Sequence, residues 1–251
     1  MTKVAIIIPA YNESENLEKL VNKINDNLND VKIFIVDDST TNESEHLLSN
    51  KKNVRFYYRG EKLGRGSAVL FGFTQSLKEN FDLYVEMDAD FSHDPNELKE
   101  KVNFFLKNNL DLLIASRYLS KSKIINWSFS RKIFSKMSNF LARKLLKIPV
   151  SDYTNGYRFY SEKAAKLVTK ECGKIGDGFI VLSEILLTIK LNGLKIGETD
   201  TIFVNRTRGE SSVNIKLIFF SLVGLLKLFL IKIKNSWNYS IKNIFGCCLY
   251  L

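Results

Sequence analysis

Short apolar segments alternate with segments of helical periodicity, and this alternation constrains the fold more than any other feature of the sequence. Four runs are almost wholly apolar: 4–8, 31–36, 83–87 and 112–115. Such runs are typical of strands buried on both faces of a parallel sheet. Between the first two runs, Leu17, Leu20 and Ile24 follow helical spacing. We therefore predict an α/β fold with a Rossmann-like, mostly parallel sheet flanked by helices.

Two of the expected strands run directly into pairs of acidic residues. Asp37 and Asp38 follow the second strand, and Asp88 and Asp90 follow the strand at 83–87. Ligands of doubly wound sheets bind beyond the carboxyl ends of the strands, so we expect all four acids to face one crevice. The Asp-x-Asp spacing places two carboxylates on one side of the chain, where they suit a hard cation such as Mg²⁺ or Mn²⁺. The alternative is a pair of solvated loop acids.

Composition narrows the classes of partner. The chain has 251 residues, enough for one large domain or one domain with an appendage, and its net charge of +10 suits an anionic partner. We expect no nucleic acid among its partners, because no recognition motif accompanies the charge. Three cysteines make no disulfide framework, so we expect a reducing, cytosolic setting. Cys248 fits the C-a-a-X prenylation pattern, which short termini often match by chance.

The pattern changes beyond residue 126. We expect a basic helix over 131–146, a polar and aromatic loop over 152–158, a mostly apolar helix over 179–191 and a short strand over 201–204. The chain carries neither a Gly-x-Gly-x-x-Gly after its first strand nor a P-loop. The layout is thus that of a nucleotide-binding protein without the dinucleotide or ATPase fingerprints.

A long apolar stretch, 215–233, lies near the C-terminus. Three lysines recur at intervals that place them on one side of a helix: Lys216, Lys227 and Lys234. The opposite side is apolar, which favours an amphipathic helix in the plane of a membrane surface over a transmembrane span or a helix packed on the core. We predict a globular domain over 1–213 and a membrane-associating helix and tail over 214–251.

Seven motifs, in this order, resemble those of the polyprenyl-phosphate (dolichol-phosphate) mannosyltransferases of glycosyltransferase family two. They lie at 8–13, 36–39, 62–68, 87–93, 116–118, 152–159 and 206–211. Each motif is weak alone, and their order makes the signal specific. The resemblance covers residues 3 to about 213.

The resemblance implies a GT-A fold and a metal-dependent, inverting transfer from a nucleotide sugar, usually GDP-mannose, to the phosphate of a polyprenol. Catalytic roles are implied for Asp88, Asp90, Arg117 and Asp152. Nucleotide-sugar contacts are implied for Pro9, Tyr11, Glu13, Asp37, Asp38, Lys62, Asp88, Ala89, Asp90 and Arg206. Acceptor-phosphate contacts are implied for Arg117, Arg131, Ser135 and Arg206. The ligands of Mg²⁺ or Mn²⁺ would be Asp88, Asp90 and Ser92, the last standing where relatives often have Gln.

This chemistry has a physical basis. Negative charge develops on the departing diphosphate, where a cation stabilises it. The attacking phosphate oxygen is already ionised near neutral pH, so a strong general base is not required, whereas guanidinium groups that seat the phosphate are. Together with the C-terminal helix, the resemblance implies a membrane-associated protein at the cytoplasmic face, with a small membrane subunit as a candidate partner.

Several alternatives stay open at this point. One is a glucosyl- or N-acetylhexosaminyltransferase that uses a UDP-sugar. Others are a non-catalytic basic binding protein and an inactive regulatory subunit, although retention of Asp88, Asp90 and the arginines argues against the latter. A polysaccharide synthase is disfavoured, because neither Trp127 nor Trp237 lies in a Gln-x-x-Arg-Trp motif.

Overall fold

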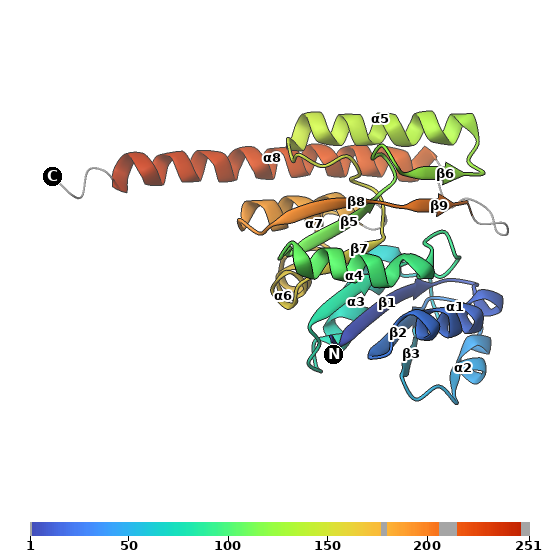
Figure 1. Cartoon of the computed structure of the whole chain (residues 1–251). Helices are drawn as coiled ribbons and strands as arrows, with labels where there is room; N and C mark the ends of the chain where they lie inside the picture. Colours follow the sequence, from blue (N-terminus) through green and yellow to red (C-terminus); the bar gives the residue numbers. More distant parts are fainter. Residues whose placement is uncertain (1, 177–179, 206–214, 247–251) are drawn as a thin grey trace.

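A seven-stranded sheet forms the centre of the protein (Figure 1). The computed structural model describes residues 2–176, 180–205 and 215–246, with side chains of the last segment given for 220–235. The strand order is β3-β2-β1-β4-β7-β5-β8. The strands are β1 (Val4–Ala10), β2 (Val31–Asp37), β3 (Val54–Tyr58), β4 (Leu83–Glu86), β5 (Leu112–Ser116), β7 (Arg158–Tyr160) and β8 (Ile196–Asp200). Only β7 runs antiparallel to its neighbours, which confirms the predicted mostly parallel sheet.

Helices cover both faces of the sheet (Figure 1). They are α1 (Ser14–Asn27), α2 (Glu43–Leu48), α3 (Arg65–Ser76), the 3₁₀ turn η1 (Pro95–Glu97), α4 (Leu98–Lys107), α5 (Phe129–Leu146), α6 (Glu162–Glu171), α7 (Ile180–Leu191) and α8 (Ile215–Gly246). Apolar residues of α1 and α4 form one buried cluster with the sheet. Those of α3, α5, α6, α7 and α8 form the cluster on the other face. A small parallel ribbon joins β6 (Lys123–Ile125) to β9 (Ile202–Val204).

Three strands, β6, β7 and β8, have no clear apolar signal in the sequence. β7 falls at the end of the predicted polar loop, and its first residue, Arg158, is fully buried. The guanidinium of Arg158 donates to the carbonyl oxygens of Tyr153, Asn155 and Leu182, which compensates its burial. Because a buried charge stands in this central strand, the hydropathy of the sequence does not predict β7.

The C-terminal helix α8 packs against α7 and α5 (Figure 1). Leu225 and Leu228 are buried in the shared core, and a Cβ at Gly224 would lie 2.6 Å from Ile180 Cγ1. Packing of α8 on the core is the alternative that the sequence disfavoured, and the structure shows it for Leu225 and Leu228. Lys227 and Lys234 are exposed, whereas the side chain of Lys216 lies outside the described residues. In the part of the chain that the structure describes, every helix is too short or too polar to cross a membrane. The boundary between 1–213 and 214–251 stays a prediction.

Candidate active site

The two acidic pairs lie at the same edge of the sheet, where β2 and β4 end. β1 pairs in parallel with both strands and separates them by one position. The loop after β1 therefore lies between the acidic pairs, and it is tied to the end of β2 because the Asn12 amide donates to Ser39 Oγ at 2.8 Å. The predicted grouping of these loops at one edge follows directly from the parallel register.

Asp37 and Asp38 have different surroundings. The carboxylate of Asp38 accepts bonds from Arg59 Nε at 2.6 Å and Arg59 Nη2 at 2.8 Å, and from the amides of residues 63 and 64 at 3.0 Å each. It thereby holds the loop that leads into α3. Asp37 Oδ1 accepts from the Ser39 amide, but Asp37 Oδ2 is buried and has no partner among the described residues. Asp37 thus retains an acceptor for a ligand.

Most of the other predicted nucleotide contacts lie at the same edge of the sheet, where β1 and β4 end. The ammonium of Lys62 lies 4.2 Å from the centre of the Tyr11 ring. Glu13 is the residue preceding α1, and its Oε2 accepts from Asn16 Nδ2 at 2.6 Å. Pro9 belongs to β1 and Ala89 is buried in the loop after β4. Arg206 lies outside the described residues.

The Asp-x-Asp loop offers an all-oxygen ligand set. Asp90 Oδ1 accepts from the Ser92 amide at 3.0 Å, and Ser92 Oγ is buried without a partner in the described structure. Over the described ranges, no three His, Cys, Asp or Glu side chains are grouped closely enough to hold a metal. The set of Asp88, Asp90 and the orphaned hydroxyl of Ser92 fits a hard cation that takes its remaining ligands from water and diphosphate oxygens, as Mg²⁺ usually does.

Asp88 is held in its charged form by a neighbouring arginine. Arg65 Nε and Nη2 donate to Asp88 Oδ1 at 2.9 and 2.7 Å. Burial favours the neutral acid, but the guanidinium of Arg65 outweighs it and holds the pKa of Asp88 below its ordinary value. Asp88 is therefore a carboxylate near neutral pH.

Arg117 and Asp152 form a second charged centre, after β5. Asp152 is fully buried and accepts from Arg117 Nε at 2.7 Å, Arg117 Nη2 at 2.8 Å and the Arg117 amide at 3.0 Å. Burial raises the pKa of Asp152, but Arg117 more than reverses this, so the pKa lies below its ordinary value. The guanidinium carbon of Arg117 lies 5.2 Å from the centre of the Trp127 ring. Asp152 is thus a permanent partner of Arg117 and is not poised as a general base.

A histidine connects the two charged centres. The Asp88 amide donates to His93 Nδ1 at 3.0 Å, so the proton of the neutral ring lies on Nε2, which is 3.0 Å from Asn155 Oδ1. The backbone amide of Asn155 in turn donates to Asp152 Oδ1 at 3.0 Å. The His93 ring is stacked on Tyr157 with centroids 4.9 Å apart. These hydrogen bonds therefore fix the position of the Asp-x-Asp loop relative to the Arg117 centre.

A basic hollow of about 360 Å³ opens beside Arg117. Its lining residues are Arg117, Tyr118, Ser122, Ile124, Lys132 and Lys136. Tyr118 Oη donates to Ser135 Oγ at 2.6 Å, which places Ser135 next to the hollow. Arg131 instead donates to Asn205 Oδ1 at 2.7 Å and stacks on Trp127. Of the three predicted acceptor residues that the structure describes, Arg117 and Arg131 both lie against the Trp127 ring, and Ser135 lies beside the hollow.

Sequence reasoning missed several residues of this region. Lys132 and Lys136 are one helical turn apart, a spacing that could have paired them. Neither lysine has an ion-pair partner among the residues that the structure describes. Glu86 was visible as the first of three alternating acids with Asp88 and Asp90, but it reads as part of the apolar strand. Arg65 gives no signal beyond the glycines that flank it.

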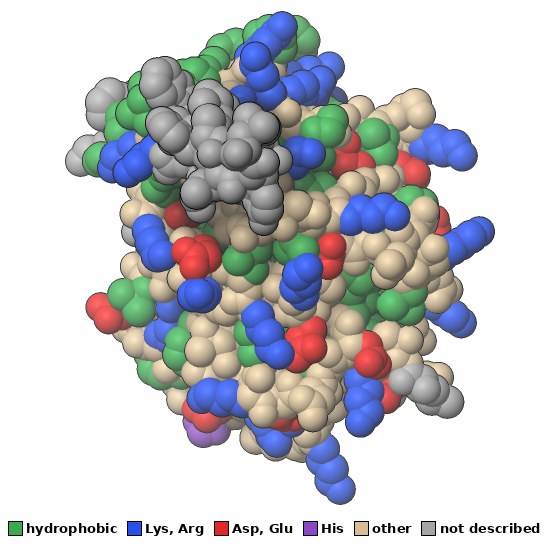
Figure 2. All heavy atoms as spheres, turned by 90° about the vertical axis from the view of Figure 1, so that its left-hand side faces the viewer, with side chains coloured by type: hydrophobic (Ala, Val, Ile, Leu, Met, Phe, Trp, Pro, Cys, Tyr) green, Lys and Arg blue, Asp and Glu red, His purple; other side chains and the backbone are tan. Residues whose placement is uncertain are grey.

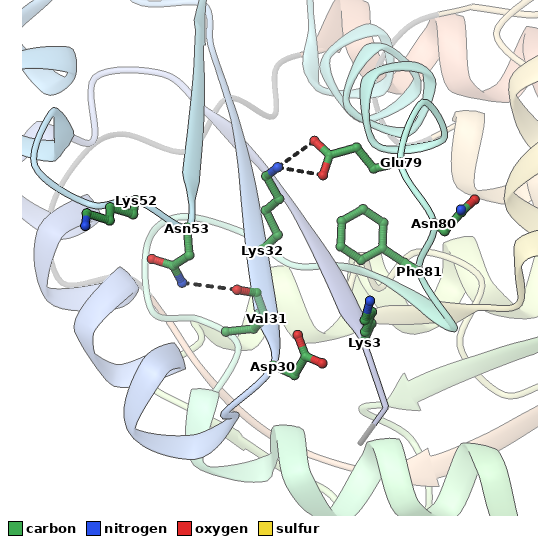
Figure 3. Close-up of a pocket in the computed structure, with 9 residues that line it drawn as sticks. All are labelled: Lys3, Asp30, Val31, Lys32, Lys52, Asn53, Glu79, Asn80 and Phe81. Atoms are coloured by element: carbon green, nitrogen blue, oxygen red, sulfur yellow. Dashed lines mark hydrogen bonds and ion pairs between the residues drawn. The ribbon is translucent and has the colours of Figure 1, made fainter.

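A second hollow, of about 480 Å³, lies at the opposite edge of the sheet (Figure 3). It is lined by residues at the amino ends of β1, β2 and β3, among them Lys3, Lys32 and Asn53. The ammonium of Lys32 pairs with both oxygens of Glu79 at 2.6 Å (Figure 3). Because it faces away from every acid discussed above, this larger hollow is not the candidate active site.

Comparison with known proteins decides the family. The family described as glycosyl transferase family 2 matches residues 5–168, about two thirds of the chain. The chain belongs to glycosyl transferase family 2. This membership confirms the predicted family and the predicted enzyme class, a glycosyltransferase.

Named relatives extend the match over most of the glycosyltransferase. This chain is 31% identical over 217 residues to the polyprenol monophosphomannose synthase of Mycolicibacterium smegmatis, and the alignment covers 84% of this chain and 81% of the relative. It is 37% identical over 233 residues to the dolichol-phosphate mannosyltransferase of Pyrococcus furiosus, covering 90% of this chain but 63%, less than two thirds, of that relative. A solved glucosyl-3-phosphoglycerate synthase from Mycobacterium tuberculosis superimposes with a TM-score of 0.63 at 17% identity, covering 92% of this chain and 80% of the other. This structural likeness confirms the GT-A fold.

Proposed function

We propose that this glycosyltransferase transfers mannose from GDP-mannose to the phosphate of a polyprenyl phosphate, with inversion at the anomeric carbon. The observation that carries the proposal is the connection of two charged centres, an acidic pair suited to a cation and a basic hollow at Arg117, through His93 and Asn155. The names of the relatives, polyprenol monophosphomannose synthase and dolichol-phosphate mannosyltransferase, support the choice of sugar and acceptor.

On the donor side, each residue has a distinct role in this proposal. Asp37 Oδ2 is the free acceptor for an N–H group of the nucleobase, and Lys62 and Tyr11 cover the nucleotide. Asp88, Asp90 and Ser92 would hold Mg²⁺ or Mn²⁺. When bound, the cation supplies charge neutralisation at the diphosphate, the leaving group of the transfer. Asp88 is kept ionised for this by Arg65.

On the acceptor side, the hollow supplies cations and no free base. The nucleophile in this proposal is a phosphate oxygen, which needs positioning and charge compensation but no proton removal. Asp152 is fully committed to Arg117, in agreement with that requirement. Lys132 and Lys136 add two ammonium groups that no carboxylate of the described structure neutralises. Their hollow therefore suits an anion, and the proposal assigns it to the acceptor phosphate.

Replacing both lysines tests this assignment. For Lys132→Met with Lys136→Met, we expect the KM for a short, water-soluble prenyl phosphate to rise by about tenfold or more, because charged hydrogen bonds each contribute about 1.5–3 kcal/mol. The KM for GDP-mannose should stay within about twofold. Initial-rate kinetics with each substrate varied in turn measure both values. Lys144→Met, which removes a charge from the far end of α5, is the control. An equal rise in both KM values, or none, contradicts the assignment.

An apolar stripe beside the hollow supports association with a membrane surface. That this surface is the cytoplasmic face stays a prediction. On α5 the exposed fractions of Phe129, Met137 and Phe140 are 80%, 62% and 60%. Leu226 and Leu230 of α8, which packs alongside, are also exposed. Figure 2 shows hydrophobic side chains near the upper edge, where Figure 1 places α5 and α8, with lysines and arginines dispersed over the face. The stripe would hold the tail of a polyprenol while its phosphate reaches the hollow. A small membrane subunit stays a prediction.

Sedimentation with vesicles tests the stripe. For Met137→Glu with Phe140→Glu, we expect at least about a tenfold loss of binding to vesicles of phosphatidylcholine and phosphatidylglycerol, because two large apolar side chains no longer enter the lipid. The matched control, Phe104→Glu with Leu106→Glu, changes two exposed apolar side chains of α4 on the other side of the sheet. Equal binding by both double variants contradicts the role of the stripe.

The function itself is tested by following the sugar. The purified protein is incubated with vesicles that contain polyprenyl phosphate and with labelled GDP-mannose, UDP-glucose or UDP-N-acetylglucosamine, and the lipids are then extracted. We expect label in the lipid fraction from GDP-mannose alone, and only when polyprenyl phosphate and Mg²⁺ or Mn²⁺ are present. Label from a UDP-sugar instead supports the alternative donor, and label in no lipid contradicts the proposal.

A further inference from the structure

Arg65 connects the Asp-x-Asp loop to a buried acid that precedes it. Arg65 is the first residue of α3, and its Nη1 donates to Glu86 Oε1 at 2.6 Å. Its other two nitrogens both donate to one oxygen of Asp88, Oδ1. One guanidinium thus bridges two carboxylates two residues apart on β4 and the loop after it. None of the predicted roles included this residue.

Glu86 fixes the position of Arg65. The Glu86 side chain is fully buried at the end of β4, where an unpaired carboxylate would be strongly unfavourable. Its second oxygen accepts from Tyr160 Oη at 2.7 Å, so Arg65 and Tyr160 together satisfy both oxygens. The backbone of Gly156 closes the other side, because a Cβ at this position would overlap the Arg65 guanidinium. The Glu86 carboxylate and the Gly156 backbone therefore restrict the position of the Arg65 guanidinium.

This arrangement makes the two oxygens of Asp88 unequal. Oδ1 is engaged by two nitrogens of Arg65, whereas Oδ2 lies 3.8 Å from His93 Nε2 and is the oxygen left for a ligand. Two carboxylates, Glu86 and Asp88, thus share one guanidinium.

We propose that Arg65, held by Glu86, is a positioning residue that turns Asp88 so that a single oxygen, Oδ2, is offered to the divalent cation of the donor site. The inference rests on the cation site of the proposed function and adds the residues that prepare it. Groups that orient a metal ligand typically change metal affinity or activity by about 10–100-fold when they are replaced. Arg65 belongs to this class because it bonds directly to Asp88, and Glu86 acts through Arg65.

The test measures Mn²⁺ binding and needs no turnover. Arg65→Met with Glu86→Gln removes one charge of each sign, so the net charge of the cluster is unchanged and Tyr160 keeps an oxygen to donate to. With GDP present, we expect the Kd for Mn²⁺, followed by the electron paramagnetic resonance of the free ion, to rise by about tenfold or more. Arg65→Lys keeps the charge but cannot bridge both carboxylates, so it should weaken Mn²⁺ binding in the same way. Thermal unfolding of each variant checks that the fold is retained.

A matched pair at a distance is the control. Lys32→Met with Glu79→Gln removes the ion pair of the hollow in Figure 3 and should leave the Kd for Mn²⁺ unchanged. Binding of Mn²⁺ by Arg65→Lys with the affinity of the unmodified protein overturns the inference, because charge alone then suffices. Mannosyl transfer to lipid, measured as above, reports separately on the proposed function, so the failure of one is distinguishable from the failure of the other.

Discussion

Asp90→Asn is expected to lower kcat by about a thousandfold, because a cation at a leaving group supplies several kcal/mol of transition-state stabilisation. The substitution keeps the oxygen that accepts from the Ser92 amide and removes only the negative charge. The free energy of unfolding should therefore change by less than about 1 kcal/mol. Steady-state kinetics with GDP-mannose and urea unfolding measure the two quantities on the same preparation.

The matched control for this prediction lies in the same loop. Asp94 caps η1 by accepting from the Asn96 amide at 2.9 Å, and Asn is an equally good capping residue. Asp94→Asn should leave kcat within about twofold of the unmodified protein, since it removes a charge of the same sign outside the ligand set. Turnover by Asp90→Asn at the level of this control would remove the assignment of Asp90.

Asp152→Asn is expected to lower the free energy of unfolding by about 3–5 kcal/mol, because it leaves the buried charge of Arg117 without its partner. Such a loss is a large fraction of the total stability of a typical domain, about 5–15 kcal/mol. The control is Glu162→Gln, whose partner is Lys166. Their side chains are 51% and 61% exposed, so its loss should cost less than about 1 kcal/mol. Equal effects of the two substitutions in urea unfolding would contradict the buried pair.

The same pair predicts a pH dependence. The pKa of Asp152 is lower in the folded protein than the ordinary value of about 3.9, so its contribution is fully present above that value and is lost as the pH falls through the lower, folded pKa. The difference in stability between the unmodified protein and Asp152→Asn should therefore shrink below about pH 4. A difference that stays constant down to pH 3 contradicts the depressed pKa.

Most of the sheet could be predicted from the sequence because its parallel strands are buried on both faces. That environment selects uninterrupted apolar runs such as 31–36 and 112–115, which the structure places in β2 and β5. β7 escaped because Arg158, a buried charge, stands in a strand of only three residues. Its guanidinium donates to carbonyl groups of residues up to 24 positions away, and these partners cannot be identified from the local sequence.

The candidate site was predictable where spacing along the chain carries the chemistry. Asp88 and Asp90 were found because both acids follow one strand at a spacing that suits a cation. Arg65 was not, because its partners lie 21 and 23 residues further along and meet it only after α3 packs on the sheet. Likewise, the family resemblance points to Arg131, but only the fold shows that Arg131 donates to Asn205 while Lys132 and Lys136 line the hollow.

The central claim is that the carboxylates after β4 hold a cation beneath the diphosphate of a nucleotide donor. Anomalous scattering from Mn²⁺ in crystals grown with Mn²⁺ and GDP tests it most directly. We expect one strong peak within coordination distance of Asp90 and Asp88 Oδ2, with diphosphate density beside it and Arg65 still bonded to Asp88 Oδ1. A peak at any other place, or bound GDP with no Mn²⁺ peak near these carboxylates, would contradict the account.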